Sequence, residues 1–149
     1  MGSNKTIQIK VITPERTVFE GEMYQATLPV SDGLATILPD HRSYIASLKP
    51  GEIIMKKDPK DAEEVDLYVS GGFIEFHANN LVVMSDEAER AEEIDLKEAE
   101  EARKRAEELK NRKFTDENEY AMVVASIEKQ LARINIARKS YSRRGVRME

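Results

Sequence analysis

The chain has 149 residues, a formal net charge of −5 and no cysteine. This length allows one ordinary domain, or one small domain with an appendage. The lack of cysteine excludes a disulfide framework, a zinc–thiolate site and a thiol nucleophile. No apolar run approaches the ~18 residues of a membrane-spanning helix, and the N-terminus lacks the charged-then-apolar layout of a secretory signal.

The first 85 residues alternate short apolar stretches with turn signals. Ile7, Ile9 and Val11 alternate with polar residues, a pattern that predicts a half-buried strand. The further strands that we expect lie at residues 17–20, 24–29, 35–38, 45–48, 53–55, 65–70, 73–76 and 81–84. Turn-forming residues, mostly Pro and Gly, separate these stretches, and strands at this spacing predict an antiparallel β-sandwich.

A pair of glycines, Gly71 and Gly72, interrupts the strand pattern near the end of this half. Glycine inside a strand pattern often marks a kink or a bulge. We therefore expect Phe73 to be buried in the core behind this break.

From Asp86 the composition changes to Ala, Glu, Lys and Arg. Asp95 with Glu98 three residues later predicts the start of a helix, and a second start is predicted at residues 115–117 after a polar break. The apolar stripe of the first helix consists of Ala99, Ala102, Ala106 and Leu109, and that of the second consists of Tyr120, Val123, Val124, Ile127, Leu131 and Ile134. Residues 140–149 are expected to fray.

These elements predict an α+β chain of two modules. An N-terminal antiparallel β-sandwich is expected over residues 1–87 and a C-terminal antiparallel helical hairpin over residues 88–149. Residues 86–120 contain 14 acidic and 8 basic side chains, whereas residues 121–149 contain 2 acidic and 7 basic ones. The basic segment is therefore expected to meet an acidic surface, either of a partner or of the first helix, and both readings remain open.

Five motifs in order point to a known family. They are Val11-Ile12-Thr13-Pro14, the segment from Gly33 to His41, Ser47-Leu48-Lys49-Pro50-Gly51, Val69-Ser70-Gly71-Gly72-Phe73-Ile74-Glu75, and the segment from Glu89 to Asp95. Over nearly its whole length the chain resembles the epsilon subunit of bacterial and chloroplast proton-translocating ATP synthases.

The resemblance implies a non-catalytic rotor subunit of the central stalk. It implies contact with the gamma subunit, the ring of c subunits and the catalytic alpha and beta subunits, and a helical hairpin that restrains ATP hydrolysis when it unfolds toward the catalytic head. It also implies a peripheral membrane protein at the cytoplasmic face of the bacterial inner membrane, with no direct membrane insertion and no required cofactor.

The resemblance assigns the ring-facing loop to residues 31–42, where the usual pattern is Glu-Gly-Glu-Leu-Gly-Ile-x-Pro-Gly-His. Leu34 stands where an acidic residue is usual, and Asp40 replaces the last glycine. The implied ring contact therefore rests on the polar tip formed by Asp40, His41 and Arg42; the alternative is an exposed loop histidine with no specific role.

Many members of the family bind ATP between the folded helices through an Ile-Asp-x-x-Arg-Ala pattern. Here Glu98 replaces the arginine and reverses the charge where a phosphate needs a cation. The positions that match this implied site are Glu89, Ile94, Asp95, Ala99, Arg105, Lys129 and Arg133. We expect ATP to be at most a weak regulatory ligand.

The resemblance also implies an inhibitory basic surface that meets the catalytic subunits, formed by Arg133, Arg138, Lys139, Arg143 and Arg144. The alternative function is a stand-alone adaptor whose basic helical hairpin binds an acidic protein partner. A hydrolase that uses Asp40 and His41 is disfavoured, because adjacent strand residues point apart and no catalytic or metal-ligand motif is present. Nucleic-acid binding is disfavoured by the net negative charge.

Overall fold

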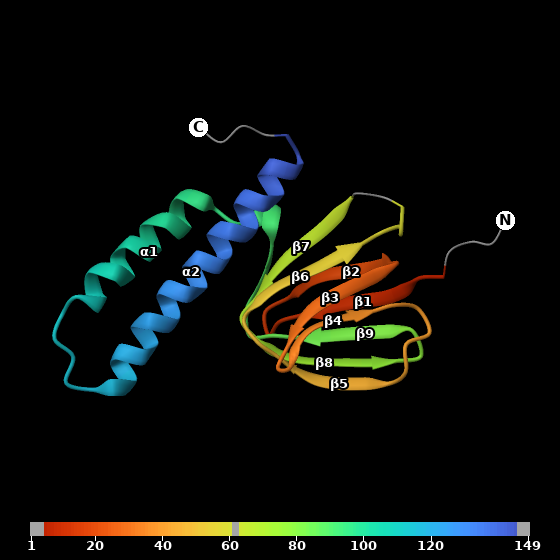
Figure 1. Cartoon of the computed structure of the whole chain (residues 1–149), viewed down its shortest axis with the longest axis horizontal. Helices are drawn as coiled ribbons and strands as arrows, with labels where there is room; N and C mark the ends of the chain where they lie inside the picture. The colour runs from red at the N-terminus through yellow and green to blue at the C-terminus, as the bar shows by residue number, and fades with distance from the viewer. Residues whose placement is uncertain (1–4, 61–62, 146–149) are drawn as a thin grey trace. The chain divides into compact units, whose positions relative to one another are not determined.

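The computed structural model describes residues 5–60 and 63–145. These residues fall into two compact units that divide after Arg90 (Figure 1). The first unit contains the strands and the second contains the helices. The predicted order of a β-sandwich followed by two helices is confirmed. Among the described residues, no helix has the length and apolar character that crossing a membrane requires.

The described part of the first unit contains ten strands. They are β1 (Ile7–Ile12), β2 (Thr17–Met23), β3 (Gln25–Val30), β4 (Gly33–Ile37), β5 (Tyr44–Leu48), β6 (Gly51–Lys56), β7 (Glu64–Val69), β8 (Gly72–His77), β9 (Asn80–Met84) and β10 (Ala88–Arg90). The strand order is β10-β7-β6-β3-β5-β8-β9-β1-β2, and β4 pairs with β3 outside this path.

The pairing is antiparallel at every described contact but one. Strands β1 and β9 run parallel, with Ile9 opposite Leu81 and Val11 opposite Val83. The sandwich is therefore not purely antiparallel, in contrast to the sequence-based expectation. A parallel pair needs a long connection, and here the whole segment from β2 to β8 separates the two strands.

The core is formed by every second residue of most strands. Ile7, Ile9 and Val11 of β1 are fully buried, as are Val83 of the adjacent β9 and Ile74 of β8, the next strand in the sheet. This is the period-2 burial expected of a sheet with one face in the core. Strand β7 differs, because its last four residues are all buried.

The expectation that Phe73 is buried is wrong. The side chain of Phe73 is 60% exposed, whereas Ile74 and Phe76 are buried. Strand β8 begins at Gly72, so its alternation places residues 74 and 76 on the core side and residue 73 on the outer side. The double glycine determines where β8 begins, and therefore which of its side chains face the core. It does not create a pocket for Phe73.

Two further element boundaries differ from the sequence-based prediction. Strand β2 continues through Gly21, which was expected to end it. Residues 88–90, assigned above to the helical half, form β10 and pair with β7. A three-residue strand that depends on a distant partner leaves little periodic signal in the sequence.

The second unit contains a short 3-10 helix, η1 (Ala91–Glu93), and two long helices, α1 (Leu96–Lys110) and α2 (Glu117–Arg143). Both predicted helix starts are confirmed: the side chain of Asp95 accepts a hydrogen bond from the Glu98 N–H at 3.0 Å, and that of Asp116 accepts one from the Asn118 N–H at 2.9 Å. Helices α1 and α2 form an antiparallel hairpin (Figure 1).

The buried side of the hairpin is narrower and lies nearer its open end than the stripes suggested. Ala99, Ala106, Ile134 and Ala137 are buried, but Leu109 and Tyr120 are about 40% exposed. Helix α2 also continues to Arg143, so residues 140–143 are helical where fraying was expected. Residues 146–149 lie outside the described residues.

Candidate functional site

The outer side of the first unit presents an apolar row across three neighbouring strands. Ile12 of β1 lies opposite Met84 of β9, and Met84 lies opposite Phe73 of β8. Phe73 is 60% exposed and Met84 is 40% exposed. In the neighbouring row, Val82 and Ile45 flank Glu75 in register, and Ile45 is 74% exposed.

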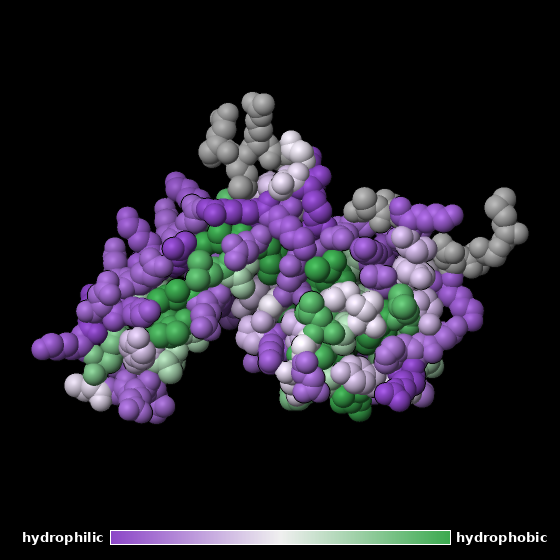
Figure 2. Space-filling model, viewed as in Figure 1, coloured by the Kyte–Doolittle hydropathy of each residue, from purple (hydrophilic) through white to green (hydrophobic). Residues whose placement is uncertain are grey.

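We call these five residues, Ile12, Ile45, Phe73, Val82 and Met84, the apolar outer face. Figure 2 shows hydrophobic residues reaching the surface of the first unit between hydrophilic ones. A groove of about 370 Å³ borders the face and is lined by Ile12, Thr13, Pro14, Gly72, Phe73, Met84, Ser85 and Asp86. Contiguous exposed apolar residues with a polar rim are typical of a protein interaction site.

Another exposed apolar residue, outside the apolar outer face, lies on β4 next to the β3–β4 turn. Leu34 is 78% exposed and lies opposite Pro29 of β3. Its neighbours in β4 alternate, with Ile37 fully buried. Leu34 therefore points outward at the position where the resemblance usually has an acidic residue.

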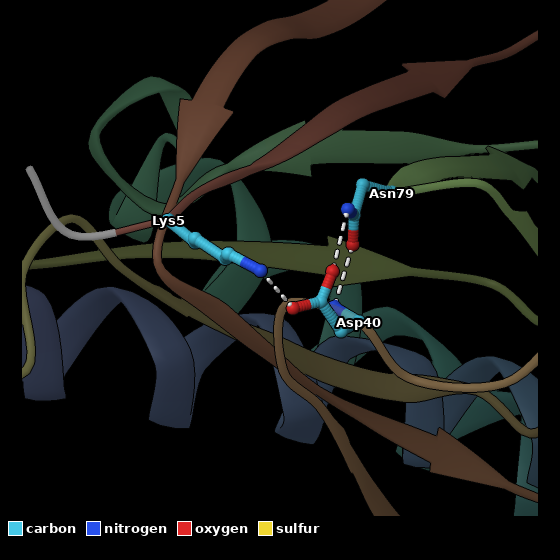
Figure 3. A network of polar contacts seen from close by, with 3 residues as sticks. All are labelled: Lys5, Asp40 and Asn79. Atoms are coloured by element: carbon cyan, nitrogen blue, oxygen red, sulfur yellow. Dashed lines mark hydrogen bonds and ion pairs between the residues drawn. The ribbon is translucent and has the colours of Figure 1, made fainter.

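At the other end of β4, Asp40 is held by two partners (Figure 3). Lys5 Nζ lies 2.6 Å from Asp40 Oδ2, the Asp40 N–H donates to Asn79 Oδ1 at 2.6 Å, and Asn79 Nδ2 donates to Asp40 Oδ1 at 3.1 Å. Asp40 adopts φ 67, the left-handed conformation that glycine adopts most easily. These contacts stabilise at Asp40 a backbone conformation that suits the glycine usual at this position.

The same contacts set the ionisation of the pair. The hydrogen bond from Lys5, then the hydrogen bond from Asn79 and the charge of Lys5, hold the pKa of Asp40 below its ordinary value. The hydrogen bond to Asp40 and the Asp40 charge raise the pKa of Lys5. Each charged group favours the charged form of the other.

His41 is engaged within its own loop. Its backbone N–H donates to the Leu38 carbonyl at 3.1 Å, and its Nδ1 lies 2.7 Å from the Arg42 carbonyl, which requires the proton on Nδ1. Its ring makes edge contacts with Tyr44 and Phe76, with centroids 5.8 Å apart in both pairs. His41 therefore shapes the loop, and its neighbours Asp40 and Arg42 are both exposed.

The predicted ring-facing segment is divided into two surfaces. Strand β4 has 5 residues, so at ~3.4 Å per residue its first and last Cα atoms are roughly 14 Å apart. Leu34 lies near the start of this strand, and Asp40, His41 and Arg42 follow its end. Lys5 and Asn79, which position Asp40, were missed from the sequence because they are 35 and 39 residues away from it.

Most residues of the implied nucleotide site lie in the second unit, where several have structural roles. Asp95 caps α1, and Ile94 and Ala99 are buried. Arg133 Nη1 donates to Glu98 Oε2 at 3.2 Å and to Gln130 Oε1 at 2.7 Å. Arg105 is exposed and Lys129 is half-buried.

Glu89 belongs to the first unit, whereas the other residues of that set belong to the second. It belongs to β10 and lies opposite Tyr68 of β7. The strand position, rather than a helix, therefore fixes its backbone.

The basic residues near the end of α2 differ in their exposure and in their contacts. Arg138 Nη2 lies 2.7 Å from Glu100 Oε1 of α1. Arg144 caps α2, donates to the Ser140 carbonyl at 3.4 Å and lies over the Tyr141 ring. Lys139 and Arg143 are exposed. The described residues contain no cluster of His, Cys, Asp and Glu that fits a metal ion.

The sequence matches known proteins over most of its length. Residues 6–91 match the family model of the β-sandwich domain of the ATP synthase delta/epsilon chain. The chain is 38% identical over 133 residues to the ATP synthase epsilon chain of Dehalococcoides mccartyi strain CBDB1, covering 89% of this chain and 93% of that protein. It is 43% identical over 102 residues to the epsilon chain of Dichelobacter nodosus, covering 68% and 70%.

Two solved structures share the fold. A chain of the Euglena gracilis mitochondrial ATP synthase, solved as OSCP/F1/c-ring, aligns with a TM-score of 0.71 and 18% identity over 88% of this chain and 81% of that chain. A chain of the Tetrahymena thermophila mitochondrial ATP synthase, solved as central stalk/c-ring, aligns with a TM-score of 0.55 and 17% identity over 93% and 98%. The sandwich model and the long match to a bacterial relative agree, and the chain belongs to the ATP synthase epsilon-chain family.

Proposed function

We propose that this epsilon subunit docks onto the gamma subunit through the apolar outer face of its sandwich and links the rotor to the c ring. We further propose that it performs no chemistry itself and restrains ATP hydrolysis through its helical unit. As part of the ATP synthase it would be bound peripherally at the cytoplasmic face of the membrane. Membership of the epsilon-chain family favours this role over a stand-alone adaptor.

The observation that carries the docking proposal is the row formed by Ile12, Met84 and Phe73. Three strands place these side chains in register on the outer side, although inward positions are available on each strand. Burying roughly 100 Å² of an exposed aromatic ring contributes roughly 2–3 kcal/mol. Aromatic residues and Met are also enriched at the centres of protein interfaces.

Binding to the gamma subunit tests this proposal. Phe73→Ala combined with Met84→Ala is expected to weaken binding of the purified chain to gamma roughly 30- to 100-fold, which corresponds to roughly 2–3 kcal/mol. Glu22→Ala, an exposed change on β2, is the matched control and is expected to leave binding within twofold. If the double variant binds gamma as tightly as wild type, the apolar outer face is not the docking surface.

The ring contact that the resemblance assigns to residues 31–42 has two candidate surfaces. We propose the turn beside Leu34, because an exposed leucine gains from burial against a partner. In addition, the Asp40 side chain is held by Lys5 and Asn79. Leu34→Ser is expected to reduce ATP synthesis by membranes rebuilt with the variant more than Arg42→Ala does. The opposite ranking would assign the contact to the tip formed by Asp40, His41 and Arg42.

The basic end of α2 is the proposed inhibitory surface. Arg143 and Lys139 are exposed, and a cluster of such charges interacts most strongly with acidic groups in a partly dry interface. Replacing Lys139, Arg143 and Arg144 by alanine is expected to relieve inhibition of ATP hydrolysis while binding to gamma persists. Arg138 is left unchanged in this variant, since it pairs with Glu100. Full inhibition by the triple variant would exclude this surface.

A further inference from the structure

The helical unit contains a buried arginine that links its two helices. The Arg133 side chain of α2 is 9% exposed, whereas the Glu98 side chain of α1 is 50% exposed. Arg133 Nη1 donates to Glu98 Oε2 at 3.2 Å and to Gln130 Oε1 at 2.7 Å. Gln130 is itself 7% exposed. The guanidinium thus reaches a carboxylate of the opposite helix while a buried amide of its own helix orients it.

The backbone of Glu98 is positioned independently of Arg133. Its backbone N–H donates to Asp95 Oδ1 at 3.0 Å, the capping bond of α1. A second ion pair also joins an arginine of α2 to a glutamate of α1. The distance from Arg138 Nη2 to Glu100 Oε1 is 2.7 Å. Both carboxylates belong to α1 and both arginines to α2, so the pairs favour the closed hairpin over separated helices.

The apolar contacts between the helices are small by comparison. The buried residues of α1 are Ala99 and Ala106, which lose little apolar area because their side chains are single methyl groups. A helix in a protein depends on packing for most of its stability. The polar contacts at Arg133 therefore contribute a larger fraction of the free energy of hairpin closure than they would if leucines packed between the helices.

We propose that Glu98 is a built-in anion that closes the hairpin by holding Arg133, so that the closed state needs no bound phosphate compound. Burying a guanidinium is costly unless an anion pairs with it. In this chain the carboxylate of Glu98 occupies that place. Removing the carboxylate takes an anionic partner from Arg133 and shifts the hairpin toward the open state, which an added anion would reverse.

The inference rests on the proposed function in one respect, namely that opening of the hairpin has a role in the ATP synthase. The closure itself is a property of the isolated chain. Loss of gamma binding would therefore contradict the docking proposal and leave the proposal about Glu98 standing, and the reverse also holds.

Distance measurements between two spin labels test the proposal in the full chain. The sequence contains no cysteine, so Lys104→Cys on α1 and Ala125→Cys on α2 give a labelled pair at exposed positions. Without nucleotide, the otherwise unchanged chain is expected to show one short distance. Glu98→Gln is expected to raise the ratio of open to closed hairpin about tenfold, which corresponds to about 1.4 kcal/mol.

Three comparisons separate an ion pair from a general loss of structure. Glu101→Gln, the matched change at an exposed glutamate of the same helix, is expected to leave the distances unchanged. The charge exchange Glu98→Arg with Arg133→Glu is expected to restore the closed distance. Circular dichroism of each variant reports whether both helices persist.

Added phosphate compounds complete the test. Millimolar ATP is expected to leave the wild-type distances unchanged and to shift Glu98→Gln back toward the closed hairpin; inorganic phosphate distinguishes the phosphate group from the nucleoside. The proposal is overturned if the wild-type hairpin closes only when ATP is added, or if Glu98→Gln is as closed as wild type.

Discussion

Asp40 and Asn79 hold each other across two different loops of the sandwich. The Asp40 N–H donates to Asn79 Oδ1 at 2.6 Å, and Asn79 Nδ2 donates back to Asp40 Oδ1 at 3.1 Å. Both residues have a positive φ, 67 for Asp40 and 61 for Asn79. Asn and Asp are the side-chain-bearing residues that tolerate this conformation best, so each loop stabilises the unusual turn of the other.

This reciprocity predicts an order of stability at position 40. Asp40→Gly relaxes the backbone strain but removes the side-chain contacts, whereas Asp40→Ala removes the contacts and keeps the strain. Unfolding in urea is expected to show a lower midpoint for Asp40→Ala than for Asp40→Gly. Equal midpoints would mean that the positive φ of Asp40 has no energetic consequence.

The pH dependence of stability follows from the Lys5–Asp40 pair. The folded-state pKa of Asp40 is below its ordinary value of 3.8, so its contribution is present above that value and is lost as the pH falls through the folded pKa. The folded-state pKa of Lys5 is above its ordinary value of 10.5, so its contribution is present below 10.5 and is lost as the pH rises through the folded pKa.

Unfolding free energies of wild type and Asp40→Asn at several pH values check this prediction. The difference between the two proteins is expected to be constant across about pH 5–9 and to shrink in acid; the difference between wild type and Lys5→Gln is expected to shrink in strong alkali. Because the pair is exposed, 1 M salt is expected to reduce both differences. A difference unaffected by pH would show that the charges of the pair contribute nothing.

The part of this fold that the sequence predicts well is local. Asp95 and Asp116 cap helices with bonds to residues two or three positions away, and Ile7, Ile9 and Val11 reveal their burial by alternation alone. The misses depend on distant partners. Strand β10 exists through its pairing with β7, and the conformation of Asp40 depends on Lys5 and Asn79. The outward position of Phe73 depends on where β8 begins.

The same division applies to the candidate site. The sequence identifies Asp40, His41 and Arg42 as a polar tip. It does not reveal that Lys5 and Asn79 hold Asp40 or that His41 contacts its own loop. The apolar outer face was missed because an exposed apolar residue and a core residue look alike in a strand pattern. The phase of the strand, fixed by pairing with its neighbours, distinguishes them.

Adjacent positions 73 and 74 therefore predict opposite effects on folding. Ile74 is fully buried, so Ile74→Ala is expected to cost about 2–5 kcal/mol of unfolding free energy. Phe73→Ala is expected to cost under about 1 kcal/mol, since its ring is mostly exposed. Urea denaturation of both variants measures this difference. A larger loss of unfolding free energy for Phe73→Ala than for Ile74→Ala would mean that the Phe73 ring is part of the core.

Gly72 of β8 occupies a position where a side chain does not fit. Its φ is 120, and a Cβ there would lie 2.0 Å from the Met84 carbonyl oxygen of the paired strand. Gly72→Ala is expected to cost about 2–6 kcal/mol, combining about 1–3 for backbone strain with about 1–3 for overpacking. Gly33→Ala is the control, because φ at Gly33 is 134 but a Cβ there meets nothing within 4 Å. Equal melting temperatures for the two variants would mean that β8 and β9 move apart to accommodate the Cβ without loss of stability.

The boundary of the sandwich yields the last prediction. Ala88 to Arg90 form β10 against β7, Ala88 is 6% exposed, and Arg90 Nε donates to the Val18 carbonyl at 3.2 Å. The Arg90 guanidinium also lies 5.4 Å from the centroid of the Phe19 ring. A chain that ends at Glu87, the boundary expected from composition, loses all of these contacts and leaves β7 as an uncovered edge.

We therefore expect a chain ending at Arg90 to be more stable than one ending at Glu87 by roughly 2–4 kcal/mol, summing a few hydrogen bonds of about 0.5–1.5 kcal/mol with a cation–π contact of about 0.5–1 kcal/mol. Arg90→Ala in the longer chain isolates the contribution of the side chain. Both truncated chains are expected to bind gamma at high concentration, because neither removes the apolar outer face, and the shorter one is expected to aggregate sooner through the edge of β7. If the two chains melt alike, β10 does not stabilise the sandwich, and the unit ends at Glu87 as its composition suggests.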